Sequence, residues 1–159
     1  MAAKASGSLS RRLRSILVPI DFSPDSTEAL KYAAMLAGQM GAKLILLNVV
    51  QPMTGPDFVY FPLVMENDKA MASSERELER IPASQGVDSS LIDRFVVRYG
   101  VPFQEITAAA KSLKADLIVI STRGYTGLKH VLLGSTAERV VRHAGCPVLV
   151  VRAQTGQKR

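Results

Sequence analysis

The sequence predicts an α/β fold: a five-stranded parallel open sheet, doubly wound, with helices on both of its faces. Two observations support this prediction. Five short apolar runs alternate along the chain with segments of helical periodicity, a pattern typical of parallel sheets whose crossovers are helices. The runs are also nearly continuous in apolar residues, as in strands that are buried on both faces. Together they indicate a Rossmann-like architecture.

The elements follow one another at short intervals. The expected strands are residues 16–18, 44–50, 94–99, 117–120 and 148–151, and the expected helices are residues 23–40, 66–83, 102–113 and 135–143. Ser23 or Asp25 is the expected N-cap of the first helix, and Gly41 is its expected stop. Pro82 is expected to end or kink the second helix.

Composition and charge exclude several classes of protein. The 159 residues carry a formal net charge of +6, but the excess of basic residues belongs to the two ends. Residues 1–14 contain four basic residues and residues 152–159 contain three, and neither segment contains an acidic residue. The part between them therefore holds 13 basic and 14 acidic residues. Because a nucleic-acid interface needs basic residues gathered on folded surface, we expect no nucleic-acid partner.

The same counts suggest where the protein works and how it is divided. No apolar run approaches the roughly 20 residues that span a bilayer, so we expect no membrane partner. A single cysteine suits a reducing compartment, and we expect a cytoplasmic protein. Residues 1–13 are expected to be a disordered basic leader and residues 153–159 a flexible tail, with the folded domain at residues 14–152.

The stretch from residue 116 to residue 152 contains the clearest functional signal. Its apolar run stops at Ser121, a loop with Gly124, Gly127 and Gly134 follows, and Ser135 opens a helical segment. The first backbone N–H groups of a helix lack internal partners and lie at the positive end of its dipole. Glycine lets the backbone approach a ligand closely and adopt positive φ. This order of strand, glycine loop and helix predicts an anion site.

A second loop is expected to face this one. In doubly wound sheets, ligands bind beyond the carboxyl ends of the strands, where the winding reverses. The loops expected there are residues 19–23, which include Asp21, and residues 121–134. Asp21 could instead cap the first helix, and Ser135 or Thr136 could be plain N-caps. His130, His143 and Cys146 have no companions at metal-ligand spacing, and Cys146 is expected to be a packed thiol.

These motifs resemble the universal stress protein family. The family's ATP-binding signature has a glycine, a gap of two, a glycine, a gap of nine and Gly-Ser/Thr. The matching register here is Ser121-x2-Gly124-x9-Gly134-Ser135, with serine in place of the first glycine. A rival register that starts at Gly124 leaves too few residues before Gly134. The resemblance extends to the opening ILVPIDFS, to LILLNVV, to Gly-Val-Pro before the third helix and to the closing CPVLVV.

The resemblance implies an ATP-binding subtype and a role for each matching residue. Asp21 would meet the ribose or a Mg²⁺ ion near the phosphates, and Val49 would present its backbone to the adenine edge. Pro19 and Ile20 would surround the nucleoside with backbone, and Arg123 would be a charge partner of the phosphates. Gly124 and Gly134 would let the phosphates approach closely. Ser135 and Thr136 would donate hydrogen bonds, and Ser121 would supply a hydroxyl.

The function expected on this basis is an ATP-binding stress-response regulator with little or no hydrolysis. Two alternatives remain open: a slow ATPase or nucleotide-transferring enzyme on the same fold, and an interaction module that binds no nucleotide. No P-loop motif and no Gly-x-Ser-x-Gly elbow occurs. The apolar strand at residues 148–151 is expected to lie at an edge of the sheet and to pair with its copy in a homodimer, as the family resemblance also implies.

Overall fold

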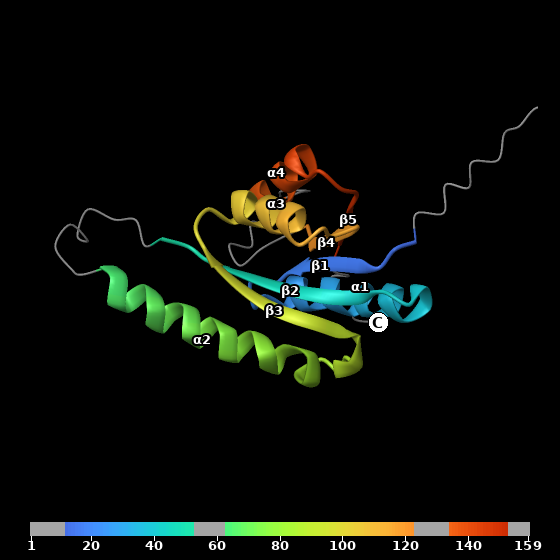
Figure 1. The fold of residues 1–159 in the computed structure, drawn as a ribbon, viewed down its shortest axis with the longest axis horizontal. Helices are drawn as coiled ribbons and strands as arrows, with labels where there is room; N and C mark the ends of the chain where they lie inside the picture. The colour runs from blue at the N-terminus through green and yellow to red at the C-terminus, as the bar shows by residue number, and fades with distance from the viewer. Residues whose placement is uncertain (1–11, 53–62, 123–133, 153–159) are drawn as a thin grey trace, which may run out of the picture.

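The chain folds around one sheet, which is enclosed by four helices (Figure 1). The structure, a computed structural model, describes residues 12–52, 63–122 and 134–152. Its elements are β1 (Ser15–Pro19), α1 (Pro24–Met40), β2 (Lys43–Val50), α2 (Leu63–Ser84), the 3₁₀ turn η2 (Ser89–Leu91), β3 (Ile92–Tyr99), α3 (Pro102–Ser112), β4 (Leu117–Ser121), α4 (Ser135–His143) and β5 (Val148–Val151).

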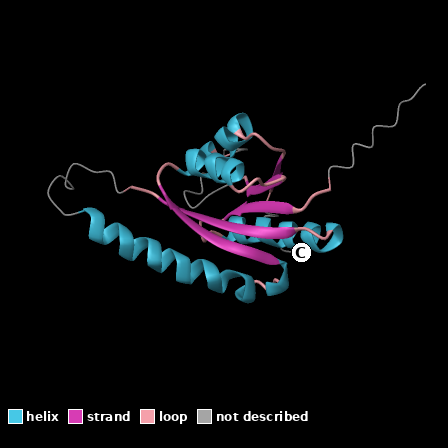
Figure 2. Cartoon of the chain, in the orientation of Figure 1, coloured by secondary structure: helices cyan, strands magenta, loops and turns pink. Residues whose placement is uncertain are grey.

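The sheet has five parallel strands in the order β3-β2-β1-β4-β5. The chain first winds outward from β1 through β2 to β3, and then returns to the other side of β1 with β4 and β5. The winding therefore reverses between β1 and β4, and the crossover helices fall on both faces of the strands (Figure 2). The predicted fold class is confirmed, and β5 lies at an edge of the sheet as expected.

Two apolar clusters hold the helices to the sheet. Alternate residues of β1 point to opposite faces, so Ile16 and Val18 pack beneath α1 and α2, whereas Leu17 packs beneath α3 and α4. All three are fully buried. Figure 1 shows α3 and α4 together on one side of the strands and α2 on the other. Burial on both faces explains why the strands are apolar almost throughout.

The ends of α1 follow the expected signals. The Ser23 side chain accepts a hydrogen bond from the Ser26 N–H, so Ser23 is the N-cap, and Asp25 lies in the first turn. Gly41 ends the helix in the left-handed conformation (φ 65°), which glycine adopts without a steric penalty.

α2 differs most from its prediction. It begins at Leu63 rather than near residue 66, and it continues through the buried Pro82 to Ser84. The stop is set by Gly86, which adopts φ 68°, while the Val87 N–H donates back to the Pro82 carbonyl. A proline near the end of a helix removes only one backbone hydrogen bond, whereas the left-handed glycine turns the chain away from the helix.

The turn η2 was not predicted. Asp88 caps it, and hydrogen bonds from Ser90 lower the pKa of the Asp88 carboxyl.

Asn48 is the one polar residue in the buried part of β2, and it positions the loop that follows β1. Its side-chain Nδ2 donates to the Ile20 carbonyl at 2.8 Å, and the Ile20 N–H donates to the Leu47 carbonyl at 2.8 Å. The Asn48 side chain is buried. Both groups of Ile20 are therefore fixed to β2 just before Asp21.

In the three described ranges, no helix is both long and apolar enough for a membrane span.

Replacing Asn48 with leucine tests this anchor. The Asn48→Leu variant leaves the buried Ile20 carbonyl without a donor, and we expect the free energy of unfolding to fall by about 1–3 kcal/mol. Urea denaturation measures it. The control is Gln39→Leu, the same kind of change at an exposed position of α1, with an expected effect within about 0.5 kcal/mol. Equal stability of the two variants would contradict the anchoring role of Asn48.

Candidate functional site

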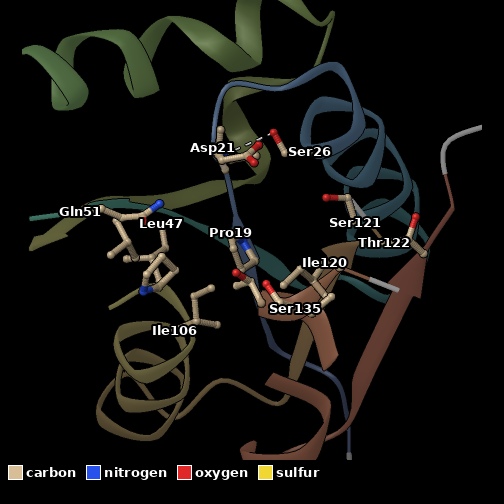
Figure 3. A pocket seen from close by; sticks show the side chains of 16 residues that line it. Pro19, Asp21, Ser26, Leu47, Gln51, Ile106, Ile120, Ser121, Thr122 and Ser135 are labelled. Atoms are coloured by element: carbon tan, nitrogen blue, oxygen red, sulfur yellow. Dashed lines mark hydrogen bonds between the residues drawn. The ribbon is translucent and has the colours of Figure 1, made fainter. Parts of the chain in front are cut away.

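A cavity opens at the carboxyl edge of the sheet, where the winding reverses. The loop after β1, the end of β2, the end of β4 and the first turns of α3 and α4 surround it (Figure 3). Parallel strands bring their carboxyl ends to the same edge, so segments far apart in the sequence meet there.

Eight of the ten residues expected at a binding site line this one cavity: Pro19, Ile20, Asp21, Val49, Ser121, Gly134, Ser135 and Thr136. The other two, Arg123 and Gly124, lie outside the described residues, as do Gly127 and His130. The structure thus brings the loop after β1 and the start of α4 together, as the sequence predicted. The part each residue plays in binding stays a prediction.

Sequence reasoning missed eight further lining residues, which are Ser26, Leu47, Gln51, Pro102, Ile106, Ile120, Thr122 and Ala137. Most of them adjoin predicted residues along a strand or helix. Pro102 and Ile106 come from α3, which was not assigned to the site. The available signal was its position, because α3 follows β3 and so begins at the same edge of the sheet.

The first turn of α4 presents backbone N–H groups to the cavity. Its N-cap, Gly134, has no side chain to accept from them, unlike Ser23 at the start of α1. The Gly134 N–H itself donates to the Thr122 carbonyl at 2.6 Å, which ties the helix start to the end of β4. The N–H groups of residues 135–137 are therefore left for a ligand or solvent.

Gly134 has an ordinary backbone conformation. Its backbone angles are φ −66° and ψ 150°, which any residue can adopt. Conformational freedom is therefore not the reason for a glycine at this position. What remains is close approach: a glycine N-cap leaves the space in front of the helix amides empty.

Asp21 lies across the cavity from α4 and is held in a tight turn. Its Oδ1 accepts hydrogen bonds from the Ser23 backbone N–H at 3.1 Å and from the Ser23 hydroxyl. The Asp21 N–H donates to Ser26 Oγ at 3.4 Å (Figure 3). Between them, Phe22 adopts φ 62°, a conformation that costs a non-glycine residue about 1 kcal/mol or more. The turn orients the carboxylate, and Ser23 rather than Asp21 caps α1.

Ser121 occupies the position of the signature's first glycine. It is the last residue of β4, it is buried, and its side chain lies at the cavity wall (Figure 3). Because the strand conformation suits any residue, serine causes no backbone strain here. It supplies a hydroxyl to the wall instead.

The described lining of the cavity carries few ionisable groups. Among the described residues that line the cavity, Asp21 is the one ionisable side chain, and no histidine, cysteine or lysine accompanies it. The described residues also contain no group of three or more side chains suited to hold a metal ion. His143 instead packs its ring against Phe103, with 5.8 Å between centroids. The arrangement offers an anion its helix amides and hydroxyls.

Comparison with known proteins agrees with the fold and the motifs. Universal stress protein MJ0531 of Methanocaldococcus jannaschii is 37% identical over 145 residues, which cover 87% of this chain and 82% of that protein. The solved structure of UspA from Lactobacillus plantarum is 29% identical with a TM-score of 0.75, and the match covers 89% and 99% of the two chains. A universal stress protein solved in complex with cAMP is 25% identical with a TM-score of 0.62, and the match covers 89% of this chain and 98% of that chain.

The match to a family description extends over most of the chain. Residues 12–152 match the sequence profile of the Universal stress protein family. The expected leader and tail, residues 1–13 and 153–159, lie almost wholly outside the described residues, so their disorder stays a prediction. With the relatives above, the match shows that this chain belongs to the universal stress protein family.

Proposed function

We propose that this protein binds ATP in the cavity at the carboxyl edge of its sheet and acts as a stress-response regulator with little or no hydrolysis. One observation carries the proposal. The first turn of α4, which has no side-chain cap, and the carboxylate of Asp21, which Ser23 holds in place, line the same cavity. Amides at a helix start suit phosphate, and a carboxylate suits ribose hydroxyls or a phosphate-bound Mg²⁺.

The base end of the proposed site is formed by β2. Successive carbonyls of a strand point to opposite sides. The Leu47 carbonyl accepts from the Ile20 N–H on the β1 side, and the Val50 carbonyl accepts from the Gly100 N–H on the β3 side. The N–H and C=O of Val49 therefore face the β1 side. β1 has ended there, because its last paired residue is Pro19 opposite Leu47. An adenine edge can take these hydrogen bonds, with Leu47, Ile106 and Pro102 as apolar wall.

The cavity is smaller than a nucleotide. It encloses about 130 Å³, against roughly 300–1,000 Å³ for typical small-molecule sites. ATP therefore extends past the described walls, and Arg123 and Gly124, which follow Ser121 in the sequence, lie outside the described residues. These two residues keep their proposed roles beside the phosphates.

Magnesium fits the proposal as an ion shared with the nucleotide. Asp21 is the one carboxylate at the described lining, and Mg²⁺ in nucleotide sites is commonly held by one or two carboxylates together with the phosphates. When bound, the ion would neutralise phosphate charge, and Asp21 would help to hold it near the phosphates.

The two alternative functions make different demands. An ATPase or nucleotidyl-transferring enzyme needs a residue to position or activate the nucleophile, and the described lining offers Asp21 alone. Turnover by nucleotide-saturated protein far below about 1 per second favours the regulator. The solved relative in complex with cAMP supports an adenine-nucleotide ligand over an interaction module without one.

Blocking the start of α4 should remove the nucleotide. A Gly134→Val side chain fills the space in front of the helix amides, so we expect on the order of tenfold or more loss of ATP affinity. Mass spectrometry of nucleotide released from freshly purified protein, together with titration calorimetry, measures it. Gly145→Val is the matched control, since a Cβ there meets nothing within 4 Å. Equal ATP from the Gly134→Val protein would place the nucleotide elsewhere.

Removing the charge of Asp21 separates its binding role from its structural one. In Asp21→Asn the remaining side-chain oxygen still accepts from the Ser23 N–H, so stability should hold. We expect the affinity for ATP with Mg²⁺ to fall about tenfold, and the benefit of adding Mg²⁺ to disappear, because a charge-assisted contact is lost. Calorimetry with and without Mg²⁺ tests this, with Asp25→Asn in the first turn of α1 as control. Unchanged Mg²⁺ dependence would refute the role.

We also propose a homodimer through β5, Val148–Val151. This strand pairs with β4 on one side, and no described strand covers its other edge. Val148 and Val150 pack toward α3 and α4, whereas the Leu149 side chain is 38% exposed. An apolar edge of this kind is suited to pair with its copy across a two-fold axis.

A charge at the edge strand tests the dimer. Charged replacements at Val148 and Val150 should give monomer. Both side chains pack against the apolar cluster beneath α3 and α4, however, so these replacements would also disturb folding. Leu149→Glu avoids this, and we expect a shift from dimer to monomer in sedimentation with little change in thermal unfolding. Met40→Glu, at an exposed position of α1, is the control. An unchanged sedimentation profile for Leu149→Glu would argue against this interface.

A further inference from the structure

A second cavity lies at the opposite, amino edge of the sheet. The last turns of α3 and α4 and the loop that leads into β5 surround it, and it encloses about 730 Å³. That volume is within the range of small-molecule sites. Because α3 and α4 both begin at the first cavity and end at the second, the two cavities share no lining residue.

Two lysines and a histidine, Lys111, Lys114 and His143, line the second cavity, and no carboxylate does among the described residues. In that part of the chain neither lysine ammonium has an ion pair. The nearest acid in sequence, Asp116, turns to the backbone N–H groups of Arg14 and Ser15, at 3.0 and 3.1 Å. Among the described residues, the two lysines therefore face this cavity without a carboxylate in its lining.

Lys114 occupies a backbone position that usually takes glycine. Its φ is 54°, its N–H donates to the Lys111 carbonyl, and the next N–H, of Ala115, donates to the Ala110 carbonyl. This pair of bonds is the Schellman motif, whose left-handed residue is most often glycine. Gly41 and Gly86 follow that rule at the ends of α1 and α2. At the end of α3 the chain instead has a strained lysine whose side chain reaches the cavity.

The chain's single cysteine faces the same cavity. Cys146 is half-buried and packs partly against the core beneath α3 and α4. Its loop is fixed to the sheet, since the Ile118 N–H donates to the Pro147 carbonyl at 3.0 Å. The sequence predicted a packed thiol here. The structure adds Lys111 and Lys114 to the same cavity wall, over thirty residues away in the sequence.

We propose that this cavity binds small disulfides bearing carboxylates and transfers one half of them to Cys146. The lysines hold the carboxylates while the Cys146 thiolate attacks one disulfide sulfur. The S–S bond of the disulfide breaks, a new bond forms between Cys146 Sγ and that sulfur, and the other half leaves as a thiolate that takes up the proton lost by Cys146. The disulfide is itself the oxidant, so each event yields one mixed disulfide and one thiol.

Charge at helix ends accounts for only part of this arrangement. Lys111 and His143 lie in the last turns of α3 and α4, where cations are favoured by the helix dipole. That preference requires neither a lysine in the left-handed position nor a thiol in the same cavity. A ligand that uses all of these groups accounts for their placement together.

The experiment compares three small disulfides of similar size and different charge: anionic dithiodipropionate, neutral bis(hydroxyethyl) disulfide and cationic cystamine. Intact-mass spectrometry of the full chain gives the rate at which Cys146 acquires each adduct. Intrinsic reactivities of the reagents cancel when the anionic-to-neutral rate ratio is compared between variants. Lys111→Gln and Lys114→Gln should each lower this ratio about threefold at low salt, and the double variant about tenfold. Concentrated salt should erase the difference between variants.

Two further variants separate binding from folding. Lys114→Gly relieves the left-handed strain, so we expect a higher melting temperature together with a lower anionic-to-neutral ratio. A purely structural lysine would not give that combination. Lys31→Gln, which breaks only an exposed pair with Glu28 on α1 (3.4 Å), should leave the ratio unchanged. An identical ratio in the double variant and the parent protein, or no reaction of folded protein with any of the three reagents, would overturn the proposal.

Discussion

Burial of both faces of the parallel sheet is the constraint on which the rest of this structure depends. A parallel sheet needs helices on each face, and each crossover returns the chain to the same edge. After β3 the chain continues on the other side of β1, so the winding reverses between β1 and β4. No crossover covers the carboxyl ends of these two strands. The first cavity is a direct consequence of that reversal.

Two local features then give the first cavity its chemistry. A glycine N-cap leaves the amides of α4 available, and the turn at Phe22 and Ser23 holds the Asp21 carboxylate at another wall of the same cavity. The turn is fixed because Asn48 and Leu47 hold Ile20 just before it. A positive helix end and a carboxylate at fixed separation suit a ligand with an anionic tail and polar hydroxyls. Membership of the universal stress protein family and the proposed adenine nucleotide agree with this arrangement.

The pair α3 and α4 connects the two ends of the molecule. Both helices start at the first cavity and finish at the second, and they pack on the same core cluster. Their first turns present positive dipole ends to the first cavity, while their C-terminal ends bring Lys111, Lys114 and His143 to the cavity that Cys146 also lines. Two separate ligand chemistries can therefore occupy opposite edges of one sheet without sharing a residue.

The sequence by itself determined the fold class, the bounds of these helices and strands to within three residues, and the meeting of the loop after β1 with the start of α4. It could do so because apolar periodicity, N-caps and stop glycines act over a few neighbouring residues: Ser23, Gly41 and the start of α4 at Ser135 were all readable locally. Where local signals competed, at Pro82 within α2 and Gly86 beyond it, the helix continued past the proline to Ser84.

Only the tertiary structure decided which distant residues share a surface. The contribution of α3 to the first cavity, the anchoring of Ile20 by Asn48 and the meeting of Lys111 and Lys114 with Cys146 all depend on the order of strands. That order is set by packing across the whole sheet and not by any short stretch of sequence. For Gly134 the structure adds that the backbone angles are ordinary, so that close approach of a ligand is the remaining reason for a glycine there.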